Sequence, residues 1–402
     1  MSTARVELIN SLTAAFGRGN CVVLLGPRQC GKTTLAREFA AGALVVQSAK
    51  DGASVNQPVR SFDLEDPLDL AELANPKLTL SALEGLVIID EFQRKLELLP
   101  LLRVLLDRPN TATKFLLLGS ASPDLLRGSS ESLAGRVEFI EMGGFSISEV
   151  GVKHISRLWQ RGGYPRAFLS ANDGDSYVWR QNYIRTFFET DLRQLGINIA
   201  PAAISRAFAM LAHHHGQIFN ASELARSLGI AQTTARNYLD VLTGALVVRQ
   251  LQPWFENVAK RQVKSPKFYI RDSGIAHSLL NIRNQQELQR HPKVGASFEG
   301  FVVEQLLSVA DARQAYFWGT QGGAELDLLL FHQGKRIGVE IKHSDSPSAS
   351  KSMHIASADL ALDELWLIYP GERTFAINEF ITAMSISSAL QRLRALNEDN
   401  HF

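Results

Sequence analysis

The sequence predicts an α/β protein with a parallel sheet in its first 150 residues, and three observations support this fold class. Short apolar runs recur at 21–25, 86–90 and 114–119, as expected for buried parallel strands. Helical segments separate these runs, and such alternation favours parallel pairing. A glycine-bounded turn follows the first run and leads directly into a helix. Further strands are expected at 44–48, 59–64 and 136–141, and an amphipathic helix within residues 1–20.

The glycine-bounded turn has the residue types of a phosphate-binding loop. Its glycines let backbone N–H groups turn inward, and the following helix adds a positive N-terminal dipole. Lys32 adds a positive charge, and the Thr33 hydroxyl can bind Mg²⁺. We therefore expect a nucleoside triphosphate with Mg²⁺, whereas the plainer interpretation is an ordinary turn between strand and helix. The candidate binding residues are Gly26, Pro27, Arg28, Gln29, Cys30, Gly31, Lys32, Thr33 and Thr34.

Carboxylate and hydroxyl residues end the next two buried strands. Asp90 is expected to meet Mg²⁺ through water, and the adjacent Glu91 to orient or deprotonate the attacking water. Ser120 follows the strand at 114–119, where a sensor of the γ-phosphate would stand. These groups could instead cap the helices that follow them. The phosphate loop upstream favours the catalytic interpretation.

The composition limits the class of protein. The 402 residues leave room for two or three domains, and 45% apolar with 21% charged residues indicates a folded chain. No apolar run approaches the length of a membrane span, so no membrane partner is expected. Cys21 and Cys30 are expected to be free thiols in a reducing cytoplasm. The net charge of +1 is not that of a strongly basic nucleic-acid-binding protein.

Changes in pattern along the chain predict four parts with different architectures. Strands and helices alternate in the first part, helices fill the second, and the fourth returns to an α/β pattern. In the third part, three helices and a hairpin follow one another, which is the order of a winged helix-turn-helix. The parts are a phosphate-loop domain at 1–150, a helical lid or linker at 151–203, a winged helix-turn-helix domain at 204–290 and a small α/β domain at 291–402.

The third helix expected in the winged unit carries polar residues that could enter a DNA major groove. The hairpin after it is basic through Arg249 and Lys267, which suits contact with phosphate. Its Trp254 and Tyr269 could stack on unpaired bases or pack in a core. The alternative is a winged helix that binds protein. The candidate DNA-binding residues are Gln232, Thr233, Arg236, Asn237, Lys260, Arg261 and Lys264.

Acidic residues lie on two neighbouring strands of the last part. Asp327 is on the first strand and Glu340 on the next, where Lys342 shares the face of Glu340 about 6–7 Å away. Two carboxylates can bind Mg²⁺ and a lysine can position water, and a helix acid, Glu299 or Glu304, could complete the site. The arrangement resembles the PD-(D/E)xK nuclease core, which implies a nuclease-like fold and metal-dependent phosphodiester hydrolysis. The plainer alternative is a cross-strand salt bridge.

Two further groups of basic residues have a structural and a functional interpretation. His213, His214 and His215 have no cysteine or carboxylate at ligand spacing, so a solvated helix end is expected. Arg127 or Arg136 could reach the γ-phosphate of a neighbouring subunit as an arginine finger in a ring or dimer. A local ion pair with Glu131 or Glu138 is the alternative for these arginines.

Together, these motifs resemble a prokaryotic AAA+-like ATPase family that joins an AAA_14 phosphate-loop domain to a DUF4143 C-terminal region. The resemblance implies a P-loop NTPase sheet of the AAA+ type, in the additional-strand, catalytic-glutamate class. It also implies hydrolysis of ATP with Mg²⁺ and an end module like that of PD-(D/E)xK nucleases. The resembling segments are 26–33, 89–91, 119–122, 132–136, 162–165, the winged unit and 322–342.

Three functions follow as hypotheses. The first is an ATPase that couples ATP turnover to movement on, or remodelling of, DNA, with Lys32, Thr33, Asp90, Glu91 and Ser120 at its site. The second is an ATP-regulated DNA nuclease that cuts at the acidic residues of the last part. The third is a nucleotide-gated scaffold whose winged helix binds protein and no DNA.

Overall fold

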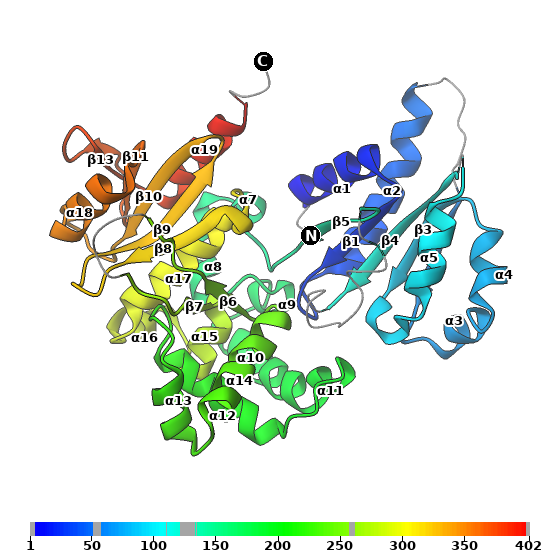
Figure 1. The fold of residues 1–402 in the computed structure, drawn as a ribbon, viewed down its shortest axis with the longest axis horizontal. Coiled ribbons are helices and arrows are strands. Elements are labelled where there is room, and N and C mark those ends of the chain that lie inside the picture. Colours follow the sequence, from blue (N-terminus) through cyan, green and yellow to red (C-terminus); the bar gives the residue numbers. More distant parts are fainter. Residues whose placement is uncertain are drawn as a thin grey trace. The chain divides into compact units, whose positions relative to one another are not determined.

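The computed structural model describes residues 5–50, 58–109, 111–120, 133, 135–256 and 262–398, with the backbone alone described for 43–50 and 398. The chain divides into two compact units, each built from several stretches of sequence. Figure 1 labels their helices and strands. Unit 1 comprises Met1–Phe145, Arg185–Pro201 and Asp240–Val247, and unit 2 comprises Ser146–Ile184, Ala202–Leu239 and Val248–Phe402.

The described part of unit 1 contains a parallel five-stranded sheet in the order β2-β3-β4-β1-β5. The predicted α/β class and parallel sheet are therefore confirmed. Strands β1, β3 and β4 are buried almost throughout, which explains their continuous apolar sequences. The strands are β1 Cys21–Leu25, β2 Val59–Asp63, β3 Gly85–Asp90, β4 Thr113–Gly119 and β5 Glu138–Glu141.

Alternate residues of the three central strands β1, β3 and β4 pack into one core cluster with helices on one side of this sheet. Val23, Ile89 and Leu117 belong to one core cluster that includes Leu99 and Leu102 of a single helix. Helices α1 and α2 contact the strands as well, and Figure 1 shows α1 beside β1 and β5. The helices of the N-terminal segment are α1 Val6–Arg18, α2 Lys32–Lys50, α3 Pro67–Glu72, α4 Pro76–Ser81 and α5 Leu98–Leu106.

One predicted strand is wrong. Residues 44–48 continue helix α2, which runs to Lys50. Alanines flank the segment at 40, 41, 43 and 49, no proline interrupts it, and the single Gly42 does not end a helix on its own. The amphipathic helix predicted within residues 1–20 is present as α1, which buries Leu12, Ala15 and Phe16.

The described part of unit 2 contains a mixed six-stranded sheet in the order β12-β13-β11-β10-β9-β8. Strands β8, β9 and β10 are antiparallel, whereas β10, β11 and β13 run parallel. Helix α18, Lys351–Leu360, buries Met353 and Leu360 in a core cluster shared with these strands. The strands are β8 Ala315–Gly319, β9 Glu325–His332, β10 Lys335–Ile341, β11 Glu364–Ile368, β12 Phe375–Ala376 and β13 Ile381–Met384.

Three helices and an antiparallel strand pair follow one another between residues 201 and 270, in the order expected from the sequence. The Asn220 side chain caps the second of these helices, which ends at Gly229 in the left-handed region with φ 67°. The assignment of this segment as a winged helix stays a prediction. The elements are α12 Pro201–His213, α13 Ala221–Leu228, α14 Gln232–Gly244, β6 Val248–Leu251 and β7 Lys267–Ile270.

The helices that remain are mostly short. None of the described helices is both long enough and apolar enough to cross a bilayer. They are α7 Ile147–Val150, α8 Ile155–Arg161, α9 Pro165–Phe168, α10 Asp173–Thr186, α11 Leu192–Gln194, α15 Ser273–Leu279, α16 Gln285–Arg290, α17 Val294–Leu307 and α19 Ile386–Glu398.

Candidate functional site

The predicted phosphate loop connects the end of β1 to the start of α2. Its backbone passes through the left-handed region at Gln29, with φ 62°, and at Gly31, with φ 103°. A β-carbon on Gly26 would lie 2.4 Å from the carbonyl oxygen of Met142, so only glycine fits there. Because α2 begins at Lys32, its first N–H groups have no acceptor inside the helix and can bind an anion.

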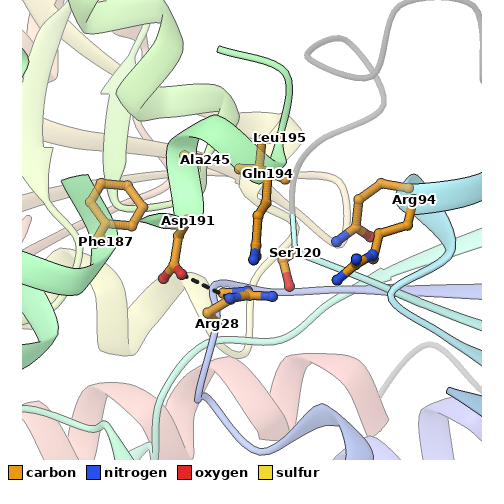
Figure 2. Close-up of a pocket in the computed structure, with 9 residues that line it drawn as sticks. Arg28, Arg94, Ser120, Phe187, Asp191, Gln194, Leu195 and Ala245 are labelled. Carbon is orange, nitrogen blue, oxygen red and sulfur yellow. Dashed lines mark hydrogen bonds and ion pairs between the residues drawn. The ribbon is translucent and has the colours of Figure 1, made fainter. Parts of the chain in front are cut away.

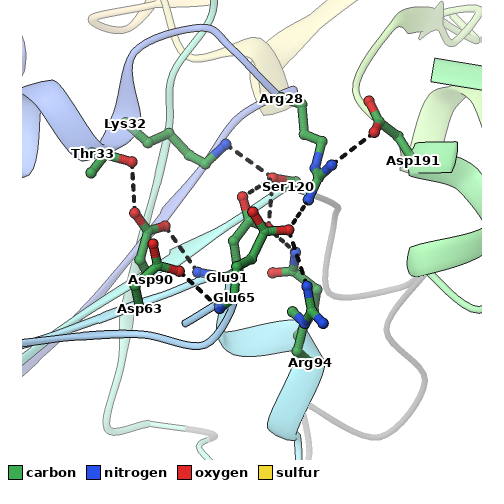
Figure 3. A network of polar contacts seen from close by, with 11 residues as sticks. Arg28, Lys32, Thr33, Asp63, Glu65, Asp90, Glu91, Arg94, Ser120 and Asp191 are labelled. Carbon is green, nitrogen blue, oxygen red and sulfur yellow. Dashed lines mark hydrogen bonds and ion pairs between the residues drawn. The ribbon is translucent and has the colours of Figure 1, made fainter. Parts of the chain in front are cut away.

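Lys32 is held over this loop by three acceptors. Its Nζ donates to the carbonyl oxygens of Gly26 at 2.8 Å and Pro27 at 3.2 Å, and to Ser120 Oγ at 3.1 Å. The side chain is buried, so its charge acts in a medium of low dielectric constant. Figure 3 shows Lys32 and Ser120 pointing toward each other from different elements.

Asp90 and Thr33 lie within reach of a common cation. The Thr33 hydroxyl donates to Asp90 Oδ2 at 2.6 Å, and the Glu91 N–H donates to Asp90 Oδ1 at 2.9 Å. Burial raises the pKa of Asp90 above its ordinary value, an effect that the hydrogen bond from Thr33 opposes. A hydroxyl and a carboxylate this close are suitable oxygen ligands for Mg²⁺, so these residues fit the ion that the sequence predicts.

Glu91 combines a strained backbone with a carboxylate that faces the loop. Its φ is 53°, which a non-glycine residue rarely adopts and which tends to occur at functional sites. Ser120 Oγ donates to both carboxylate oxygens at 3.2 Å, and the Gln93 side chain donates as well. Lys32 at the start of α2, Ser120 after β4 and Glu91 after β3 therefore form one hydrogen-bonded chain.

A second network joins the phosphate loop to a helical stretch of the same unit. Arg28 donates from Nη1 to Asp191 Oδ1 at 2.8 Å and from Nη2 to Glu65, which also pairs with Arg94 at 3.1 Å. Asp191 is buried and ends a π-helix at Phe187–Asp191, an interruption that is frequent at functional sites. The sequence does not single out Asp191 and Glu65, because neither follows the loop at a fixed spacing.

Arg28, Arg94 and Asp191 line a small pocket together with Ser120, which Figure 2 shows with the Arg28–Asp191 ion pair. Burial raises the pKa of Asp191, and the charge of Arg28 opposes that rise. The ion pair therefore compensates a carboxylate that would otherwise be costly to bury. The lining residues are Arg28, Gln93, Arg94, Ser120, Phe187, Asp191, Gln194, Leu195 and Ala245.

The substitution Asp191→Asn is expected to destabilise the protein by about 1–2 kcal/mol, because Arg28 then loses a charged acceptor. Urea unfolding measures this loss. In an Arg28→Met background the same substitution should cost less, since the partner is already absent. Equal costs in both backgrounds would show that the ion pair does not contribute to stability.

The arginine-finger candidates receive no support from the described contacts. Arg136 forms an ion pair with Asp107, Nε to Oδ1 at 2.6 Å, and Glu138 pairs with Arg18 instead. Arg127 lies outside the described residues, as do the DNA-binding candidates Lys260 and Arg261. A finger in trans stays a prediction.

In the C-terminal part, the structure brings three of the predicted acids into one cluster. Glu299 and Asp327 each pair with Lys267, at 2.8 and 2.9 Å, and Glu340 lies 3.8 Å from the Lys342 ammonium. Within the described part of the chain, no group of three or more His, Cys, Asp or Glu side chains is arranged to hold a metal ion. The geometry therefore does not support the predicted metal site.

Glu304 does not join that cluster, and two basic residues of the hairpin are not free for phosphate. Glu304 accepts hydrogen bonds from Arg249 and from Arg271, the latter at 3.2 Å. Lys267 is buried, and Tyr269 is buried as well, with its hydroxyl donating to Glu299 at 2.7 Å. The expected roles of Arg249 and Lys267 in phosphate contact are therefore wrong, because local acids neutralise both residues.

The predicted solvated helix end is wrong for one of the three histidines. His215 is buried, and its Nδ1 accepts a hydrogen bond from the Ile270 N–H at 3.0 Å. Burial lowers the pKa of His215 to about 4, so the ring is neutral at pH 7. Residues of β7 and α17 cover it, which no local spacing in the sequence could indicate.

The polar face predicted on α14 is accessible. Gln232, Thr233, Arg236 and Asn237 are exposed, and Lys264 before β7 is exposed as well. Trp254 of the hairpin packs against Tyr316 and Phe331, so core packing accounts for this aromatic residue.

The sheet, the loop and the residues around it define an AAA-type P-loop domain. An AAA domain description (AAA_14) matches residues 18–151, and a domain of unknown function (DUF4143) matches residues 294–389. Another domain of unknown function (DUF8612) matches residues 152–286. The chain belongs to the family that joins an AAA_14 domain to a DUF4143 domain, as the sequence motifs indicated.

Two mycobacterial proteins are similar in sequence to this chain over most of its length. The uncharacterised proteins Rv2008c of Mycobacterium tuberculosis and Mb2031c of Mycobacterium bovis are each 51% identical over 390 residues, covering 97% of this chain and 85% of theirs. Among solved structures, the Walker-type ATPase PABY2304 of Pyrococcus abyssi is similar at 15% identity and a TM-score of 0.46, over 69% of this chain and 96% of that one. RuvB of Thermotoga maritima is similar at 18% identity and a TM-score of 0.31, over 62% and 90%.

Proposed function

We propose that this protein binds and hydrolyses ATP with Mg²⁺ at the phosphate loop. The observation that carries the proposal is the hydrogen-bonded chain from Lys32 through Ser120 to Glu91, beside the pair of Thr33 and Asp90. Five side chains of the types needed for phosphate binding, metal binding and water activation meet where α2 begins and the neighbouring strands β3 and β4 end. AAA-type domains use such residues for this reaction.

Each residue has a distinct task in this proposal. Lys32 and the first N–H groups of α2 bind the phosphate oxygens, and Thr33 with Asp90 holds Mg²⁺. Bound Mg²⁺ would offset the negative charge of the phosphates. Glu91 accepts a proton from the attacking water, and Ser120 donates to the γ-phosphate from its position between Lys32 and Glu91. Burial strengthens these electrostatic contacts.

A second candidate function is DNA binding through α14, and the exposed row of Gln232, Thr233, Arg236 and Asn237 favours it. These residues occupy the first half of the second helix in a helix-turn-helix order, the position that contacts bases in such motifs. Arg236 and Asn237 have side chains that can hydrogen-bond guanine and adenine. ATP turnover would then be coupled to binding or remodelling of DNA.

Phosphate release measured with and without duplex DNA tests both functions. We expect turnover that DNA stimulates, and a loss of turnover in Lys32→Ala. The double substitution of Arg236 and Asn237 by alanine should lower the stimulation several-fold, whereas Arg290→Ala, at an exposed arginine on α16, should not. The assay should be run at low salt concentration, where contacts with DNA phosphates are strongest.

The outcomes separate the hypotheses. No phosphate release under any condition would contradict the ATPase proposal. Turnover without stimulation, together with no gel shift at low salt, would contradict DNA binding and favour a nucleotide-gated scaffold that binds protein. Metal-dependent DNA cleavage lost in Glu340→Ala would favour the nuclease alternative.

A further inference from the structure

A buried lysine stands at the centre of the acidic cluster in unit 2. Lys267 Nζ lies 2.8 Å from Glu299, 2.7 Å from Glu325 and 2.9 Å from Asp327. These acids come from α17 and β9, and the lysine comes from β7. With three carboxylates around one ammonium, the contacts resemble the coordination of a small cation more than a single surface ion pair.

The backbone around Lys267 fixes the lysine in this place. β7 pairs with β6, and Lys267 also forms a β-bridge with Ile218. The segment between β6 and β7 is hydrogen-bonded to edge strand β8, from Trp254 N–H to Phe317 O at 2.7 Å and from Val263 N–H to Gly319 O at 3.0 Å. These backbone pairs hold the Cα atom of Lys267 in place, and its three carboxylate partners hold the ammonium.

The lysine itself is closed to solvent. Lys267 is 2% exposed and the side chain of Asp327 is 13% exposed, whereas Glu325 at the edge of the cluster is 41% exposed. Burial of an ammonium is costly unless it is fully paired, and these acids supply that pairing. The ammonium therefore occupies the position between the carboxylates that a bound cation would need.

We propose that Lys267 is the resident cation of this cluster and takes the place of a divalent metal ion in the nuclease-like module. The acids that the sequence predicts as metal ligands are thus present, but their ligand position is filled by the chain itself. The C-terminal module then holds a latent divalent-cation site and does not cleave nucleic acid. This inference is independent of ATP turnover.

Binding of Mn²⁺ to the full-length protein, followed by electron paramagnetic resonance without nucleotide, tests the proposal. The substitution Lys267→Met should create one Mn²⁺ site at least tenfold tighter than any in the unsubstituted protein. Adding Asp327→Asn to that variant should remove the new site. Lys264→Met is the matched control, because Lys264 is an exposed lysine three positions away, and it should create no site.

Two results would overturn the proposal. One is Mn²⁺ binding by the unsubstituted protein that Asp327→Asn abolishes, since this would show an open metal site. The other is a folded Lys267→Met protein that gains no Mn²⁺. If Lys267→Met does not fold, Lys267→Gln, which keeps a hydrogen-bond donor, replaces it, and Mn²⁺ should raise its melting temperature. The titration of the unsubstituted protein decides between an open and a filled site whether or not either variant folds.

Discussion

Replacing Glu91 by glutamine is expected to slow ATP hydrolysis by roughly 10²–10⁴-fold, the usual contribution of a general base. Glutamine has the size of glutamate and can still accept the hydrogen bond from Ser120, but it cannot take a proton from water. The backbone of Glu91 has a φ of 53°, which an amide side chain should not disturb. ATP binding should therefore survive, because the phosphate contacts of Lys32 and the helix α2 amides are unchanged.

Single-turnover phosphate release and binding of a fluorescent ATP analogue separate these two effects. Lys32→Ala should lose both binding and turnover, since it removes the buried charge next to the loop. Glu97→Gln is a suitable control, because Glu97 is an exposed glutamate in the same segment after β3. Hydrolysis by Glu91→Gln at the unsubstituted rate would exclude Glu91 as the base.

The nucleotide site could be predicted largely from the sequence, because its residues follow strands at fixed positions. The loop at 26–33 comes after β1, and Asp90 ends β3 in the register that pairs it with Asp63 of β2. The carboxyl ends of parallel strands meet at one edge of a sheet, so local patterns determine the contacts of Lys32, Asp90 and Ser120.

The contacts of the C-terminal cluster could not be predicted in the same way. Asp327 and Glu299 were expected near each other, but Lys267 lies about 60 residues before Asp327 and on a different element. The sequence around Lys267 does not indicate whether this lysine contacts DNA or is buried among acidic residues. The predictions for His215 and for residues 44–48 were wrong for a related reason. Long-range packing buries His215, and helix α2 continues through 44–48, and neither effect is visible in a short sequence pattern.

Replacing Gly300 by alanine is expected to destabilise the protein by about 2–3 kcal/mol, in the range for overpacking a core. A β-carbon at this position in α17 would lie 2.2 Å from His215 Nε2 and 3.1 Å from Tyr269 Cδ1. Neither ring can easily move away. His215 Nδ1 is held by the Ile270 N–H, and the Tyr269 hydroxyl is held by Glu299.

Helix propensity alone predicts that Gly300→Ala stabilises the protein. The measured change in stability therefore shows whether helix propensity or steric overlap is the larger effect. Alanine is better than glycine inside a helix by about 1 kcal/mol. Gly295, in the first turn of the same helix, has no atom within 4 Å of the position that its β-carbon would take. Gly295→Ala should therefore leave stability unchanged or raise it by up to about 1 kcal/mol.

Urea unfolding of the two alanine variants beside the unsubstituted protein measures the difference. A loss of stability at position 300 together with no loss at 295 would show that His215 and Tyr269 are rigidly placed against α17. Because Glu299 is the neighbour of Gly300 and a partner of Lys267, the same variant should also disturb the acidic cluster. Equal stability of both variants would mean that the His215 side chain can change its conformation to make room. Its buried hydrogen bond to Ile270 would then contribute little to the free energy of unfolding.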